Sequence, residues 1–302
     1  MTDQAARPAV AGRPDTPALI AGLVTVAAWG SAFVGIRAAD RYLAPGALAL
    51  GRLLVSTAIL SVAALARREP LPGRRDLLAI AVYGIAWLGA YSITLNAAER
   101  LVDAGTAAMI INSGPLLIAL LAGAFLREGF PARLLTGCAV ALAGCLVIGA
   151  ATIHGARSGV GIALCVLAAL AYAAAVVVQK PVLARVSPFQ VTWLGCVAAT
   201  IACLPFAPAL GGDLRTASAG AIGWTIYLGA VPTALGFATW AFALRRASAG
   251  RTAALNYLIP VVAIVLGWSV LGERPPVLAL AGGALCLLGV YLARRQAATG
   301  RH

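Results

Sequence analysis

The sequence has little charge. Only 11% of its 302 residues are Asp, Glu, Lys or Arg, whereas a soluble domain carries about 25%. Apolar residues make up 61% of the chain, so the charged side chains are too few to cover its apolar surface in water. This composition excludes an ordinary soluble enzyme, and it excludes a disordered protein, because disordered chains are poor in apolar residues. The composition favours a protein that crosses a membrane several times, with a soluble array of unusually apolar helices as the alternative.

Acidic charge is especially scarce. The chain has 10 Asp and Glu against 23 Lys and Arg, and its formal net charge is +13. The basic residues lie in short runs between long apolar segments, which is how a multi-pass protein fixes its orientation in the bilayer. A nucleic-acid-binding protein would gather them in a patch or stripe. We therefore expect no nucleic-acid partner.

Acidic and histidine side chains are missing from the interior of the apolar segments. An enzyme working inside a membrane needs such a group beside a nucleophile or a second carboxylate, so we do not expect an enzyme. A proton relay through a carboxylate at the middle of the bilayer is disfavoured for the same reason. Facilitated diffusion, or exchange along the solute's own gradient, is the simpler expectation. The six cysteines form no CxxC or Cys/His cluster, and we expect no metal and no other cofactor.

Ten apolar segments are present, each close to the length of about 20 residues that crosses about 30 Å of hydrocarbon. The segments are too long and too little alternated to be strands of a barrel, and the loops are too short for a soluble domain. The sequence therefore predicts an all-α integral membrane protein with ten transmembrane helices. The predicted spans are 17–36, 46–66, 77–98, 104–126, 132–151, 159–179, 188–207, 218–242, 252–271 and 276–293.

The distribution of Lys and Arg predicts the orientation. If the amino terminus is cytoplasmic, sixteen of these residues lie on the cytoplasmic side and six on the other, with Arg52 inside a span. Positive charge favours the cytoplasmic side, so both tails, 1–16 and 295–302, are predicted to be cytoplasmic.

The two halves of the chain resemble each other. At an offset of 145 residues, Pro115 aligns with Pro260 and Ala104-Gly105 with Ala249-Gly250; at an offset of 143, Trp29 aligns with Tyr172. This pattern indicates a duplication, with five-helix halves at 17–151 and 158–294. Because five is odd, the second half enters the membrane from the opposite side. Inverted halves are typical of secondary transporters, which bind near the bilayer midplane and work by alternating access.

Several motifs resemble those of EamA-type carriers, which belong to the drug/metabolite transporter superfamily. They are Ala28-Trp29-Gly30-Ser31-Ala32-Phe33, Pro45 followed by Arg52, and the paired runs Leu126-Arg127-Glu128 and Leu271-Gly272-Glu273. The resemblance covers about residues 18–295. It implies ten helices, a central cavity lined by helices 1–4 and 6–9, and transport of small metabolites, often amino acids. On this basis we expect an exporter in the bacterial inner (plasma) membrane. The halves differ where Arg52 aligns with Gly195, so they need not bind alike.

Aromatic side chains are the leading candidates for a binding site. Tyr83, Trp87 and Tyr91 lie four residues apart and share one helix face over roughly 12 Å, and Phe237 and Trp240 lie similarly in the eighth span. Such rings could wall a cavity for an apolar or ring-bearing solute, or they could pack helices together. The remaining substrate-binding candidates are Trp29, Ser31, Asn112, Tyr172, Asn256 and Tyr257, with Gln179 and Asn96 as weaker ones.

Prolines and boundary charges are the candidates for hinges and gates. Pro115 and Pro260 fall in the middle of spans four and nine, where each would free a helix carbonyl, that of Ile111 or Asn256. These are either paired hinges at a cavity or ordinary kinks. Arg52 could serve a site or extend to water, and with Arg37 and Arg41 it could form a positive outer mouth for carboxylates. Glu128 and Glu273 are expected to cap helices or form ion pairs at a gate.

The sequence leaves a second class of function open. A passive pore, or a membrane assembly subunit that transports nothing, would share this composition. A carrier saturates and shows trans-stimulation, whereas a pore does not. The partners expected in the carrier case are a small-molecule substrate and the lipid bilayer.

Overall fold

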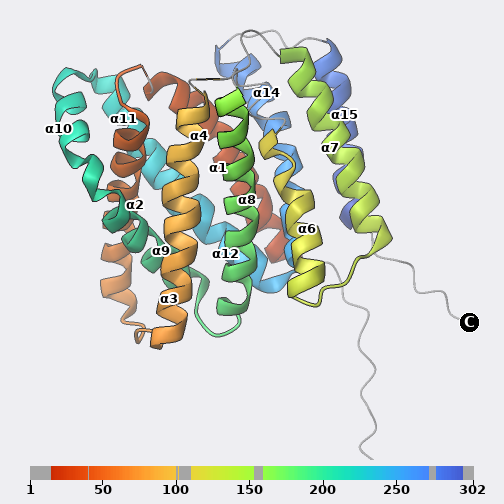
Figure 1. Ribbon diagram of the computed structural model, residues 1–302, viewed down its shortest axis with the longest axis horizontal. Helices are drawn as coiled ribbons and strands as arrows, with labels where there is room; N and C mark the ends of the chain where they lie inside the picture. The colour runs from red at the N-terminus through yellow and green to blue at the C-terminus, as the bar shows by residue number, and fades with distance from the viewer. Residues whose placement is uncertain are drawn as a thin grey trace, which may run out of the picture.

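The computed structural model describes residues 15–39, 41–99, 101, 110–152, 159–271 and 277–294, and every regular element within these ranges is helical (Figure 1). The elements of the first half are α1 (Thr16–Ala39), α2 (Pro45–Arg67), α3 (Arg74–Tyr83), η1 (Gly84–Tyr91), α4 (Ser92–Glu99), α6 (Gly114–Phe125) and α7 (Ala132–Thr152). Those of the second half are α8 (Gly159–Val182), α9 (Pro188–Cys203), η2 (Leu204–Phe206), α10 (Ala207–Thr216), α11 (Ala219–Leu228), η3 (Gly229–Leu235), α12 (Gly236–Arg246), α13 (Ala249–Ala253), η4 (Ala254–Leu258), α14 (Ile259–Leu271) and α15 (Val277–Arg294).

The helices have the lengths and the surfaces of membrane-spanning elements. Within the described ranges, seven helices are long and apolar enough to cross a bilayer, and shorter apolar helices cover Thr16–Ala32, Gly114–Phe125 and Ala132–Ile148. Large apolar side chains such as Val62, Leu65 and Val277 are exposed on the outside of the molecule. A soluble protein rarely exposes so many large apolar groups, and lipid is the solvent that suits them. The expectation of an all-helical multi-pass membrane protein is confirmed.

The predicted end of the seventh span is wrong. The sequence prediction stops at residue 207, but the chain continues through η2 into α10 and remains helical to Thr216. Pro205 and Pro208 lie at this point of the chain. Each lies in the first turn of a new helical segment, where the missing N–H is not needed, so these prolines redirect the helix instead of ending it.

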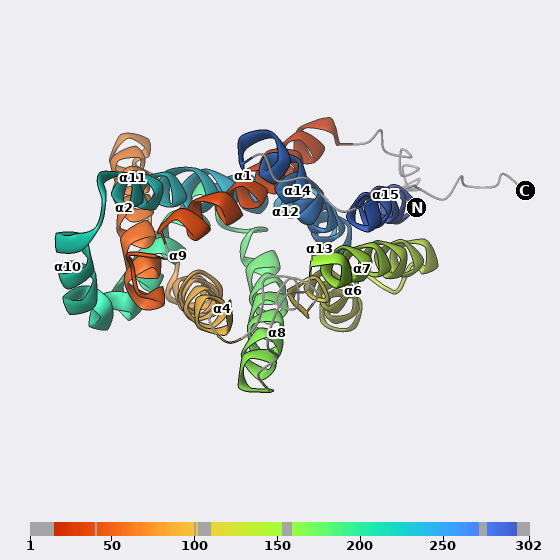
Figure 2. The same ribbon diagram turned by 90° about the horizontal axis from the view of Figure 1, so that it is seen from above.

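α7 and α15 form a pair at one edge of the molecule (Figures 1 and 2). A Cβ atom on Gly137 would lie 2.3 Å from the backbone nitrogen of Ala293, and one on Gly289 would lie 2.3 Å from that of Ala141. Only glycine permits so close an approach, and small residues are the usual means of packing two helices in lipid. The two helices therefore pack together through their small residues.

The third and eighth helices each contain a π-helical segment, η1 and η3. They begin at Gly84 and Gly229, which are 145 residues apart, the offset found in the sequence. A Cβ on Gly84 would lie 2.3 Å from the carbonyl oxygen of Gly195 in α9, and one on Gly229 would lie 2.7 Å from that of Arg52 in α2. Arg52 and Gly195 also align between the halves. Each π-helical segment thus packs, backbone against backbone, on the equivalent helix of the other half.

Polar contacts join the two halves at the end of the molecule where α3 begins and α8 ends, the lower end in Figure 1. Asp15 accepts a hydrogen bond from Arg246 at 2.8 Å, and the Arg246 guanidinium holds the pKa of the Asp15 carboxyl below its ordinary value. Asp76 pairs with Arg185 at 2.6 Å. These ion pairs lie at the end that the charge distribution predicts to be cytoplasmic.

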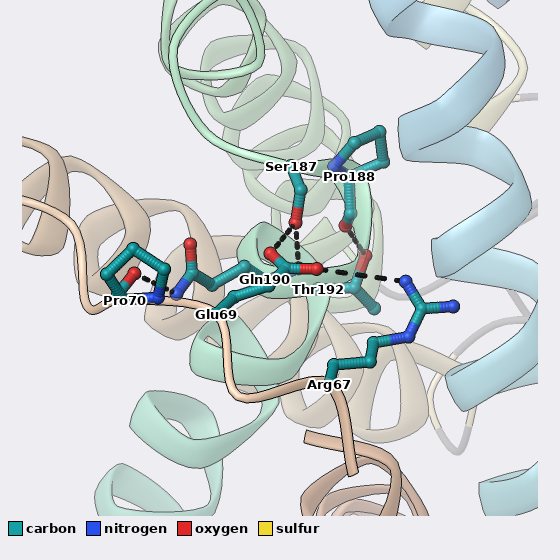
Figure 3. Close-up of polar contacts among 7 residues, drawn as sticks. All are labelled: Arg67, Glu69, Pro70, Ser187, Pro188, Gln190 and Thr192. Atoms are coloured by element: carbon teal, nitrogen blue, oxygen red, sulfur yellow. Dashed lines mark hydrogen bonds and ion pairs between the residues drawn. The ribbon is translucent and has the colours of Figure 1, made fainter. Parts of the chain in front are cut away.

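The loop between α2 and α3 contributes to the same end (Figure 3). Ser187 caps α9 by accepting the backbone N–H of Gln190 at 3.1 Å, and its hydroxyl donates to the carboxylate of Glu69. The side chain of Gln190 donates to the carbonyl of Pro70 at 2.8 Å. The start of α9 is therefore anchored to the first half by side chains that also complete its own first turn.

Candidate functional site

Seven aromatic side chains from four separate helices and one π-helical segment meet in the interior. This aromatic cluster consists of Trp29 from α1, Tyr83 from α3, Trp87 and Tyr91 from η1, Tyr172 from α8, and Phe237 and Trp240 from α12. The sequence predicted all seven as site residues. The first four belong to the first half of the chain and the other three to the second, so the cluster lies where the halves meet.

Trp87 is at the centre of the aromatic cluster. Its ring centroid lies 4.8 Å from that of Tyr172, 5.0 Å from Phe237, 5.6 Å from Trp240 and 5.7 Å from Trp29. These separations are those of edge-to-face and tilted aromatic pairs. The indole is 3% exposed, so its environment is almost entirely protein.

Both flanking indoles are oriented by hydrogen bonds. Trp29 donates its Nε1–H to the carbonyl of Pro232 at 3.0 Å, and Gly236 leaves room for this ring, since a Cβ there would lie 2.9 Å from Nε1. Trp240 donates its Nε1–H to Oε1 of Gln179 at 3.1 Å. Pro232 was not among the residues predicted for the site. A signal was present in the sequence, because Gly84 and Gly229 are 145 residues apart, the offset of the repeat, and Gly229 lies three residues before Pro232.

Several buried polar atoms beside the rings have no hydrogen-bond partner in the part of the chain that the structure describes. They include the hydroxyl of Tyr83, Nε2 of Gln179 and Oδ1 of Asn256. The orientation of Gln179 is set by Trp240, because an indole N–H can only donate, which leaves Nε2 as a free donor. Tyr83 lies near Gln179 without meeting hydrogen-bond geometry. Native proteins rarely leave buried polar groups unsatisfied, so these atoms are candidates for contact with a polar ligand or water.

Tyr172 connects the aromatic cluster to the proline-containing segments. Its ring packs on Gly114, where a Cβ would lie 2.6 Å away, and its hydroxyl accepts a hydrogen bond from Nδ2 of Asn256 at 2.5 Å. Gly114 begins α6, and Asn256 lies in η4 just before α14. Tyr172 thus contacts both predicted hinge regions at once.

The two prolines predicted to kink spans four and nine each lie in the first turn of a helical segment. Pro115 lies in the first turn of α6, after a turn at residues 112–113, and Pro260 lies in the first turn of α14, after η4. A proline is well tolerated there because no N–H is required. The carbonyl of Asn256, predicted to be freed, accepts the N–H of Ile259.

Arg52 extends from α2 toward η3. Its Nε donates to Oγ1 of Thr233 at 3.1 Å, and the Thr233 hydroxyl donates in turn to the carbonyl of Leu228 at 2.7 Å. The side chain lies beside Tyr91 and Cys196. This residue therefore crosses from the first half to the second at the edge of the aromatic cluster.

The other predicted site residues lie elsewhere. Ser31 forms a 2.7 Å hydrogen bond with the hydroxyl of Tyr227 in α11, and Tyr257 is buried in the core that includes α7 and α15. Asn112 is half-buried in the turn before α6. The side chain of Arg37 and the whole of Glu273 lie outside the described residues.

Glu128 caps a helix of the other half. Its carboxylate accepts the backbone N–H groups of Ala249 at 2.8 Å and Gly250 at 3.4 Å, while Ser248 accepts that of Arg251. Together these side chains satisfy the first N–H groups of α13. Capping was one of the two roles that the sequence suggested for Glu128.

We expect Glu128→Ala to lower the free energy of unfolding by about 1–2 kcal/mol, because two backbone donors lose a charged acceptor. Glu128→Gln keeps an acceptor oxygen and should lose less. Thermal unfolding in detergent measures the effect, and we expect the unfolding temperature to fall in the order wild type, Glu128→Gln, Glu128→Ala. An alanine variant as stable as the wild type would show that the cap contributes nothing.

Comparison with known proteins agrees with this architecture. The EamA-like transporter family matches residues 16–150 and again residues 159–295. The chain belongs to this family of membrane transporters, as the motifs had suggested.

Among its relatives is a protein of Streptantibioticus cattleyicolor named "Probable terminal-alkyne amino-acid exporter", which is 39% identical over 91% of this chain and 92% of its own. A "Probable amino-acid metabolite efflux pump" of Salmonella typhimurium is 29% identical over 89% of this chain and 92% of its own. A solved crystal structure has the same fold, with a TM-score of 0.76 and 21% identity, covering 92% of this chain and 96% of the other.

Proposed function

We propose that this protein exports small organic metabolites, with apolar amino acids as the favoured class, by alternating access across the bacterial inner membrane. The observation that carries this proposal is the aromatic cluster at the junction of the halves, with unsatisfied polar atoms beside it. Apolar walls with a few convergent polar groups are typical of small-molecule sites. The names of two relatives, an amino-acid exporter and an amino-acid metabolite efflux pump, favour the same substrate class and direction.

We further propose ten membrane crossings in two inverted halves, with both termini cytoplasmic. The seven long apolar helices and the three shorter ones supply enough segments for ten crossings. The reciprocal packing of η1 on α9 and η3 on α2 is what a two-fold axis between the halves would produce. Such symmetry lets each half adopt the conformation of the other, so that a central site opens to either side in turn.

We propose three roles for candidate site residues. The aromatic cluster and Asn256 contact the substrate. Pro115 and Pro260 allow the helices on either side of their turns to change direction, because the turns at 112–113 and 254–258 already interrupt regular helix. Glu128 holds one end of the bundle closed through its contact with α13.

The test is counterflow with the purified full-length protein in proteoliposomes. We expect saturable, trans-stimulated uptake of labelled L-propargylglycine, L-norvaline or L-phenylalanine, and little uptake of L-glutamate, whose charged side chain would be buried among rings. We also expect the flux to persist without a pH gradient. Flux that neither saturates nor responds to internal substrate would instead identify a pore, and strict dependence on the gradient would refute uncoupled transport.

A further inference from the structure

Arg52 carries a positive charge into a membrane-spanning helix, seven residues after the start of α2. A charge at this position is costly unless it is paired or serves a ligand. The ion pairs formed by the described residues involve Arg67, Arg185 and Arg246, and none involves Arg52. The structure within the described ranges therefore gives this guanidinium no balancing carboxylate.

The hydrogen bonds of Arg52 leave most of its donors available. A guanidinium has five N–H groups, and the bond to Thr233 uses the single one on Nε. That bond holds the guanidinium through Nε and does not use either of its terminal nitrogens. A planar pair of terminal nitrogens matches the two oxygens of a carboxylate.

The position of Arg52 relates directly to the aromatic cluster. Thr233, which holds Arg52, follows Pro232, which holds the indole of Trp29. Arg52 lies beside Tyr91, a member of the cluster, and both Arg52 and Tyr83 lie beside Cys196. The guanidinium and the rings are therefore neighbours, anchored by consecutive residues of η3.

The second half offers no equivalent cation. Gly195 occupies the repeat position of Arg52, and the backbone of Gly195 packs against Gly84. Arg52 thus places a cation at one side of the aromatic cluster. A ligand that suits it has one carboxylate and an uncharged, apolar remainder, and its ammonium group can lie over the ring faces.

We propose that Arg52 binds the carboxylate of the transported solute, so that the protein selects monocarboxylates with apolar side chains over the corresponding amides. This inference rests on the proposed function, because it assigns a role within the same site. The alternative is a purely structural role, in which the Arg52 side chain only joins α2 to η3. In that case the protein would not distinguish an acid from its amide through Arg52.

The experiment compares L-propargylglycine with L-propargylglycinamide, which differ in the negative charge of the carboxylate. In wild-type proteoliposomes we expect the amide to compete for counterflow about tenfold more weakly than the acid. Arg52→Gln should reduce this preference to within about twofold and lower the flux of the acid about tenfold. Arg52→Lys keeps the positive charge but lacks the planar pair of terminal nitrogens (the guanidinium fork), so it should retain part of the preference. Arg215→Gln, at an exposed position in the last turn of α10, is the matched control and should behave as wild type.

A second measurement does not depend on transport. The acid should raise the thermal unfolding temperature of detergent-solubilised wild type more than the amide does, and Arg52→Gln should lose this difference. If Arg52→Gln does not fold, Arg52→Lys tests the proposal. An Arg52→Lys variant that prefers the acid over the amide as strongly as wild type does would show that the guanidinium fork does not bind the carboxylate. Wild-type amino-acid flux without preference for the acid overturns this inference alone. Absence of saturable flux for every amino acid tested overturns the proposed function, and the inference falls with it.

Discussion

Replacing Trp87 with alanine is expected to abolish saturable transport. Trp87 contacts the rings of Trp29, Tyr172, Phe237 and Trp240, so its removal opens a void at the centre of the aromatic cluster. Removing a buried tryptophan side chain costs about 3–5 kcal/mol in a well-packed core, and each aromatic pair adds about 0.5–1.5 kcal/mol. A substrate that rests on this wall loses its contact surface at the same time.

Initial rates of counterflow measure this effect. Trp87→Phe keeps an aromatic ring and should retain part of the flux. Trp224→Ala is the matched control, because Trp224 pairs with Tyr227 in α11 and is not a member of the aromatic cluster. Size-exclusion elution shows whether each variant is folded. A folded Trp87→Ala protein with wild-type flux and affinity would show that the substrate binds elsewhere.

Gly84→Ala is expected to destabilise the protein severely. The new Cβ would lie 2.3 Å from the carbonyl oxygen and 2.8 Å from the Cα of Gly195, closer than any real contact. Both contacts are with backbone, so no side chain can rotate to relieve them, and η1 and α9 must separate. Overpacking of this kind costs about 1–3 kcal/mol or more, and here it also moves Trp87 and Tyr91 away from the second half.

Gly223→Ala is the control for this substitution. Gly223 is also helical and lies in an apolar segment, α11, but no atom of the described residues lies within 4 Å of a Cβ built there. Alanine is favoured over glycine in a helix by about 1 kcal/mol, so this variant should be as stable as wild type or slightly more stable. Thermal unfolding in detergent compares the two. Equal unfolding temperatures for both variants would refute the close approach of η1 and α9.

Much of the candidate site was predictable because the spacing of its aromatic residues follows helical geometry. Tyr83, Trp87 and Tyr91, four residues apart, were expected on one face, and all three join the aromatic cluster. Ser31 and Tyr257 show the limit of such reasoning. Both were predicted to bind substrate, and each lies close in sequence to Trp29 or Asn256. The side chain of Ser31 instead contacts α11, and that of Tyr257 packs in the core with α7 and α15.

The π-helical segments were not predictable from hydropathy. An apolar run has the same composition whether its backbone is α-helical or π-helical, and the difference arises from how Gly84 and Gly229 approach Gly195 and Arg52. The same holds for Pro115 and Pro260. Each was expected to kink a span, and the surrounding segments place each of them in the first turn of a helical segment.

The amino-acid sequence alone determined the class of this protein and the helical state of its apolar segments. Hydrocarbon requires every backbone polar group to be bonded within the chain, and long apolar segments meet that requirement as helices. Which side chains meet was decided only by the tertiary structure. Trp87 and Tyr172 are 85 residues apart, and their 4.8 Å separation depends on the packing of η1 against α8. Local patterns contain no information on such distant contacts, because these arise from the close fit of helices that meet through glycine.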